Sequence, residues 1–168
     1  MLSTRMPKFG PVRRTAFVVL AAAGVTLTPL PAFASTGVTT PAVAAAPAAA
    51  PTQAAQIAVN TALAQLGKPY VWGGAGPNSY DCSGLMQRAY SAAGIALPHS
   101  SSMQSKMGSP VAKANLQPGD LVFFYSPVSH VGMYIGNGQM VHAATAGQPV
   151  KVTNVNSMPG FNSARRLA

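Results

Sequence analysis

The chain has very few acidic side chains. Its 168 residues include 11 lysines and arginines but two aspartates and no glutamate, a formal net charge of +9 at pH 7. From Ser35 onward, seven basic residues against Asp81 and Asp120 leave a net charge of +5. These seven are scattered, with no basic helix and no interleaved aromatic residues, so the sequence gives no support to nucleic-acid binding. The charge favours only a weak attraction to anionic polymers.

Cysteine and metal-ligand motifs are also scarce. Cys82 is the one cysteine in the chain, so no internal disulfide can form. The residue is therefore an inert buried side chain, an intermolecular link or a chemically active group. The histidines and aspartates include no H-x-x-x-H spacing, and there is no C-x-x-C motif. We therefore expect no metal and no other cofactor.

A basic segment and a short apolar run open the chain. The apolar run covers residues 16–27 and is followed by Ala32-Phe33-Ala34, a small-x-small cleavage site. This layout is typical of a secretory signal peptide, and the run is too short to span a bilayer comfortably. We expect residues 1–34 to be removed and the protein to be exported, without stable insertion in a membrane; an uncleaved anchor is the alternative. Arg13-Arg14 lacks the bulky apolar residues that follow a twin-arginine signal, which favours the Sec route.

An Ala/Pro-rich linker separates this segment from the domain. Residues 35–55 carry no charge, and prolines at positions 41, 47 and 51 would break any helix. The predicted folded domain is therefore residues 56–168, which we expect to be monomeric.

The domain is predicted to place helices before strands. Apolar spacing predicts one helix over residues 56–66, and a second from Asp81 or Cys82 to Gly94. Apolar runs and turn residues then predict strands at residues 121–125, 131–135, 139–143, 150–155 and 161–167. Helices followed by an antiparallel meander indicate an α+β fold.

Cys82 lies at the predicted start of the second helix. Free backbone N–H groups and the positive end of the helix dipole favour a thiolate at such a position. The charge of Asp81 acts against this unless its side chain caps the helix.

His130 and His142 lie on the two arms of one predicted hairpin around Asn137-Gly138. A two-residue turn would pair His142 with Met133 and place the histidines on opposite faces of the sheet. A three-residue turn would pair His142 with Gly132 and bring the two imidazoles within reach on one face. The sequence permits both registers.

Five motifs in order carry a family resemblance. They are KPYVWGG at residues 68–74, DCSG at 81–84, Leu97-Pro98 before a serine-rich loop, LQPGDLVFF at 116–124 and HVGMYIGNGQMVHA at 130–143. Together they resemble the NlpC/p-sixty family of cell-wall cysteine peptidases over the whole domain. The resemblance implies a papain-like fold, in which N-terminal helices pack on an antiparallel sheet of about five to six strands.

The resemblance also implies the site. Cys82 matches the nucleophile, His130 the base and His142 the residue that orients the base, while Tyr70 matches a tyrosine that lines the cleft and can donate to the oxyanion. The implied substrate is a peptidoglycan stem peptide, cut between D-γ-glutamate and a diamino acid such as meso-diaminopimelate.

Further residues are expected around the cleft. Asp81 and Ser83 could contact the stem peptide or cap the helix. His99 stands where many relatives carry an arginine, and we expect it to be a cleft residue. Ser101 and Gln104 could line the groove, and Trp72 is expected to pack beneath its wall.

Two other functions remain open. One is a CHAP-type amidase, which would use the same Cys–His chemistry between the sugar and the first alanine. The other is a non-catalytic wall-binding module, which the presence of Cys82, His130 and His142 disfavours.

Overall fold

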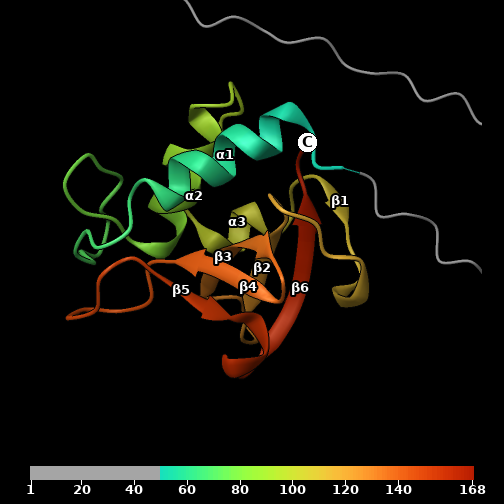
Figure 1. Cartoon of the computed structure of the whole chain (residues 1–168). Coiled ribbons are helices and arrows are strands. Elements are labelled where there is room, and N and C mark those ends of the chain that lie inside the picture. The colour runs from blue at the N-terminus through green and yellow to red at the C-terminus, as the bar shows by residue number, and fades with distance from the viewer. Residues whose placement is uncertain (1–49) are drawn as a thin grey trace, which may run out of the picture. The chain divides into compact units, whose positions relative to one another are not determined.

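The computed structural model describes residues 50–168 (Figure 1). The predicted signal peptide and most of the predicted linker lie outside these residues. Among residues 50–168, no helix combines the length and apolar character needed to cross a bilayer. The helices are α1 (Gln53–Leu63), α2 (Cys82–Ser91) and α3 (Ser101–Gln104), with short 3₁₀ turns at Lys113–Asn115 and Val155–Ser157.

Six strands form one antiparallel sheet in the order β1-β6-β2-β3-β4-β5. The α+β prediction is confirmed, and each of the five predicted strands is present with ends that differ by at most one residue. The sixth, β1, is only two residues long and carries no sequence signal of its own. The strands are β1 (Ser109–Pro110), β2 (Leu121–Phe124), β3 (His130–Gly136), β4 (Gln139–His142), β5 (Lys151–Asn154) and β6 (Phe161–Arg166).

Helix α1 lies three residues earlier in the chain than predicted. Thr52 caps it, since its hydroxyl accepts from the Ala55 N–H at 3.1 Å, so the folded unit begins before residue 56. The helix ends at Leu63. The chain after it approaches the segment just before β5, where the Gly67 N–H donates to the Val150 carbonyl at 2.9 Å. Gly67 has a φ of +82°, a conformation that suits glycine at this exit.

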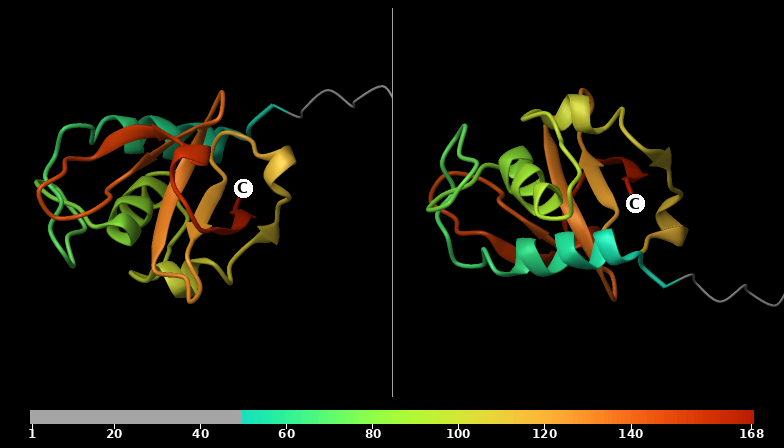
Figure 2. Two further views of the ribbon diagram at one scale, coloured as in Figure 1. Left: turned by 90° about the horizontal axis from the view of Figure 1, so that it is seen from below. Right: turned by 90° about the horizontal axis from the view of Figure 1, so that it is seen from above.

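The sheet separates two apolar clusters. Helices α1 and α2 lie together on one side of it, as Figure 1 and the right panel of Figure 2 show. Leu85, Met86 and Ala89 of α2 pack there against Val131 and Met133 of β3. A smaller cluster on the other face is covered by the segments around residues 111–116 and 155–161. Because residues 131 and 133 face the helices, Gly132 faces the second cluster, and His130, at the start of β3, has its ring 6.0 Å from that of Phe124.

The hairpin β3–β4 combines features of both predicted registers. Asn137 and Gly138 form a two-residue turn with positive φ values of 52° and 72°, as a type I′ turn requires. Ile135, however, has no partner between the pairs Tyr134–Met140 and Gly136–Gln139, which makes it a β-bulge. The extra residue moves the register by one, so Met133 pairs with Val141 and His142 comes opposite Gly132. The two histidines therefore share a face.

Candidate active site

The thiol of Cys82 lies at the first residue of α2. The helix begins there because the Asp81 side chain accepts from the Gly84 N–H at 2.7 Å and caps the first turn. Burial, and then the charge of Asp81, raise the pKa of the Cys82 thiol, whereas a backbone hydrogen bond from Val131 acts in the opposite direction. The thiol therefore contacts the backbone of β3 one residue after His130, and the free protein holds it protonated near neutral pH.

His130 and His142 form a hydrogen-bonded pair. His130 Nε2 lies 2.9 Å from His142 Nδ1, and both side chains are buried. Burial lowers the pKa of each to about 4, and the neighbouring His130 and Lys151 contribute further to the shift at His142. A Cβ on Gly132 would lie 2.8 Å from Met140 Sδ and 3.4 Å from the His142 Cβ, so glycine leaves room for this packing. Both imidazoles are therefore neutral at neutral pH.

The tautomers of this pair are linked. If His130 Nε2 donates to His142 Nδ1, then His130 Nδ1 is a free base and His142 carries its hydrogen on Nε2. If His142 Nδ1 donates instead, His130 carries its hydrogen on Nδ1 and has no free basic nitrogen. The first arrangement leaves the His142 Nε2 hydrogen without a partner, because this atom is buried and unbonded among residues 50–168. An unmet group of this kind costs about 1–3 kcal/mol.

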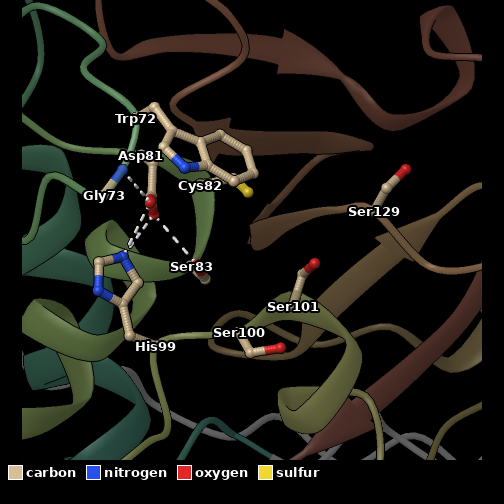
Figure 3. A pocket seen from close by; sticks show the side chains of 9 residues that line it. All are labelled: Trp72, Gly73, Asp81, Cys82, Ser83, His99, Ser100, Ser101 and Ser129. Atoms are coloured by element: carbon tan, nitrogen blue, oxygen red, sulfur yellow. Dashed lines mark hydrogen bonds and ion pairs between the residues drawn. The ribbon is translucent and has the colours of Figure 1, made fainter.

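A pocket of about 250 Å³ opens beside the thiol (Figure 3). Of the predicted site residues, Asp81, Cys82, Ser83, His99 and Ser101 all line it. Its full lining is Trp72, Gly73, Asp81, Cys82, Ser83, His99, Ser100, Ser101 and Ser129. Figure 3 shows Asp81 and His99 together at one side and the Ser100, Ser101 and Ser129 side chains across from them.

Asp81 connects the three segments that surround this pocket. Its carboxylate accepts from the Gly73 N–H at 2.8 Å and from the Ser83 hydroxyl at 3.1 Å, in addition to the helix cap. His99 Nε2 lies 2.9 and 2.8 Å from its two oxygens. Asp81 is only 6% exposed, and these four donors use the capacity of one carboxylate. It therefore fixes the 72–74 loop, the start of α2 and the 98–100 loop relative to one another.

Tyr70 lies outside the lining of this pocket. Burial raises the pKa of its hydroxyl, followed in size by the charges of Cys82 and Asp81, so the group is near the thiol and protonated at neutral pH. His130 and His142 are likewise absent from the lining; His130 directly precedes Val131, whose backbone contacts the thiol.

Two expectations about side chains near the pocket are wrong. Trp72 does not pack beneath the wall; its side chain is at the rim and 86% exposed, because the loop that carries it turns outward. Gln104 does not line the groove. It is fully buried, and its amide donates to the Ser83 and Pro98 carbonyls at 3.0 and 2.8 Å.

Sequence reasoning missed several residues at the pocket. Ser129, Ser100 and Gly73 line it; Gly73 belongs to the KPYVWGG motif and Ser100 to the serine-rich loop, whereas nothing in the sequence marks Ser129. Gly84 has a packing role, because a Cβ there would lie 2.0 Å from the Gly74 carbonyl oxygen and 2.9 Å from His99 Nε2. The glycine of the DCSG motif therefore lets these two loops approach α2. A glycine at this place in the DCSG motif is thus a sequence feature that indicates close packing.

The described part of the chain offers no metal centre: within residues 50–168, no three His, Cys, Asp or Glu side chains gather closely enough to hold an ion. The chemistry available at the pocket is that of a thiol, a neutral imidazole pair and hydroxyl groups.

Comparisons with known proteins agree with this arrangement. A probable endopeptidase of Mycobacterium bovis is 54% identical over 108 residues, covering 64% of this chain and 28% of the relative. A gamma-D-glutamyl-L-lysine dipeptidyl-peptidase of Bacillus cereus is 41% identical over 116 residues, covering 66% of this chain and 34% of the relative. The chain thus spans about a third or less of the length of these relatives.

The fold is shared with a solved structure. The peptidoglycan hydrolase RipB of Mycobacterium tuberculosis superposes with a TM-score of 0.63 at 32% identity, covering 68% of this chain and 65% of that one. Residues 67–163 match the sequence profile described as the NlpC/P60 family, and this match takes in both the DCSG motif and the histidine hairpin. The chain belongs to the NlpC/P60 family.

Proposed function

We propose that this protein is an exported cysteine endopeptidase that hydrolyses peptidoglycan stem peptides. The observation that carries the proposal is the buried His130–His142 pair, whose His130 lies on the strand whose backbone contacts the Cys82 thiol at the start of α2. The names of the relatives, which include endopeptidases and a peptidoglycan hydrolase, support the same reaction class.

The proton moves during attack rather than before it. The raised pKa of Cys82 and the lowered pKa of His130 both favour the neutral thiol–imidazole pair in the free protein. As the sulfur bonds to the amide carbon, its proton passes to His130 Nδ1, which requires the tautomer in which His130 Nε2 donates to His142. His130 then protonates the leaving amine as the C–N bond breaks. Water, activated by the same imidazole, hydrolyses the thioester and restores the thiol.

His142 acts on the base and not on the substrate. Its Nδ1 accepts from His130 Nε2, which fixes the tautomer and the ring orientation, as a carboxylate or amide does in other triads. Because His142 is neutral, this site stabilises the transient imidazolium less than a carboxylate would.

The start of α2 and Tyr70 supply donors for the oxyanion. The Cys82 and Ser83 N–H groups belong to the first turn of α2, whose N–H groups have no partner within the helix. The protonated Tyr70 hydroxyl near the thiol is a third donor. One preorganised donor of this kind contributes about 3 kcal/mol to transition-state stabilisation.

The bond that we propose is the one between D-γ-glutamate and the diamino acid. The name of the Bacillus cereus relative, which specifies a γ-D-glutamyl bond, supports this choice. The signal-like residues 1–34 support export to the cell wall, where this substrate occurs.

The test is mass spectrometry of stem peptides and peptidoglycan digested by the full chain, beside Cys82→Ala and His142→Gln. We expect a free diamino-acid amine from the unsubstituted chain, none from Cys82→Ala, and a strongly reduced rate from His142→Gln. A lactyl-ended glycan would indicate an amidase instead. No cleavage, together with a Cys82 thiol that iodoacetamide fails to modify, would contradict the proposal.

A further inference from the structure

The pocket beside Cys82 has no fixed positive charge. Its lining contains no lysine or arginine, although seven such residues occur between residues 50 and 168. Several of these cations are held elsewhere. Lys68 Nζ donates to Gln65 Oε1 and to the Pro77 carbonyl at 2.7 and 2.6 Å, and Arg165 donates to the Ser105 carbonyl at 2.7 Å. Arg166 pairs with Asp120.

The ionisable groups that do line the pocket cannot make it positive. Asp81 is the one acid of the lining, and His99 is the one group there that can become a cation. Since His99 Nε2 is directed at both Asp81 oxygens, a protonated His99 only neutralises this carboxylate. The Asp81–His99 pair therefore has no net charge when His99 is protonated and a charge of −1 when it is not.

Apart from the Cys82 thiol and the Trp72 indole N–H, the remaining polar side chains are hydroxyls. Ser100, Ser101 and Ser129 lie across the pocket from the Asp81–His99 pair (Figure 3). The Ser100 oxygen accepts from the Met103 N–H at 3.4 Å, so its own hydrogen can be donated. Hydroxyls both donate and accept, which matches the NH₂ and C=O of a carboxamide. A carboxylate would only accept, and it would bring a charge to a site that has no cation to meet it.

We infer that this pocket selects stem peptides in which the α-carboxyl group of the D-glutamyl residue is amidated. The inference rests on the proposed function, because it concerns the residue on the acyl side of the proposed scissile bond. Two negative charges within one pocket at a protein surface repel by enough to change a rate constant roughly tenfold or more. His99 is thus a specificity-determining residue: its weakly basic ring holds Asp81 without adding a permanent cation.

The test compares two synthetic tripeptides that differ only in that group, L-Ala–γ-D-glutamyl–diamino acid and its D-isoglutaminyl counterpart. The released diamino acid is measured by mass spectrometry at low salt with the full chain, and the ratio of the two kcat/KM values is the readout. We expect the amidated peptide to be preferred by about tenfold or more.

Two variants change the charge by one unit in different places. His99→Arg keeps a donor for Asp81 and adds a permanent cation at the pocket, and we expect it to reduce or reverse the ratio. Asn156→Arg adds the same charge at an exposed position outside the pocket, and we expect the ratio to stay as in the unsubstituted chain.

The outcomes separate this inference from the proposed function. Equal cleavage of both peptides, or a preference for the carboxylate, overturns the inference and leaves the endopeptidase proposal in place. A ratio that shifts equally in His99→Arg and Asn156→Arg also overturns it, because the effect would then follow overall charge. Cleavage of neither peptide overturns the proposed function itself.

Discussion

The chain has two acidic residues, and they are used in two different regions. Asp120 is 1% exposed and joins the turn before β2 to the end of β6: it accepts from the Gln117 N–H at 2.8 Å and from two nitrogens of Arg166, each at 2.7 Å. Asp81 is nearly as buried and also binds a backbone turn and a basic side chain, but its basic partner is His99.

The difference lies in the partner and in what surrounds it. Arg166 is a permanent cation, which suits a site that only holds segments together. At the pocket, a histidine holds the carboxylate with the same kind of contact and without a fixed positive charge. The Asp120–Arg166 cluster therefore stabilises the fold. The similar Asp81–His99 cluster holds the pocket together without placing a permanent cation in it.

The largest effect on stability is expected at Asp120. Asp120→Asn leaves the Arg166 guanidinium without its counter-charge, so the free energy of unfolding should fall by about 3 kcal/mol. Urea denaturation measures this, and the kcat/KM of the folded fraction should stay unchanged because the substitution is remote from the pocket. A loss below about 0.5 kcal/mol would show that the pair is not a stabilising one.

Asp81→Asn should reduce activity more than stability, the reverse of Asp120→Asn. The amide keeps the size of the side chain but cannot accept from all four donors, so the unfolding free energy should fall by about 1–2 kcal/mol. Because the 72–74 and 98–100 loops lose their common anchor, kcat/KM on stem peptides should fall by about ten- to a hundredfold. Full activity in this variant would contradict the positioning role of Asp81.

Moderate acid should act through the His130–His142 pair. The pKa of His130 and of His142 is about 4 in the folded protein, against about 6.5 when unfolded, so the unfolded state binds more protons between these values. Stability from this source is present above pH 6.5 and is lost as the pH falls toward 4. Between pH 7 and 5.5 the loss should be about 1 kcal/mol per histidine.

Urea denaturation at several pH values tests this, with His142→Gln as the comparison. The variant should lose less stability over the same pH interval, since one of the two titrating groups is gone. The acid limb of kcat/KM should likewise lie well below pH 6.5, because His130 must be neutral to act as the base. An acid limb at 6.5 or above would contradict a buried base.

The smallest effect is expected at the pocket rim. Trp72 is 86% exposed, so Trp72→Ala should change the unfolding free energy by less than about 0.5 kcal/mol. A thermal shift of several degrees would instead place this indole against the protein in solution.

The sequence predicted the features that depend on local patterns. The start of α2 follows from the cap at Asp81; Gly94 has the left-handed φ of +79° expected of it, but the helix ends three residues earlier, at Ser91. The strands follow from apolar runs bounded by turn residues. The grouping of Asp81, Cys82, Ser83, His99 and Ser101 around one pocket was also expected, from the resemblance.

What could not be predicted depends on contacts between distant segments. The outward position of Trp72 and the burial of Gln104 are set by loops that meet only in the folded chain. The register of the hairpin was left open because a turn motif specifies its two central residues and says nothing of a bulge one position before it. Thr52 is not predicted as a cap because it directly follows Pro51 in an Ala/Pro-rich stretch.

The bulge at Ile135 ties the histidine pair to one register of the hairpin. If Ile135 paired with Met140 and the bulge were lost by a slip of one residue, His142 would come opposite Met133 and its imidazole would turn to the far face, away from His130. Deleting Ile135 has the opposite result, because it removes the unpaired residue and leaves Met133 opposite Val141, with both histidines on one face. A shortened hairpin therefore keeps the histidine pair, whereas a slipped one loses it.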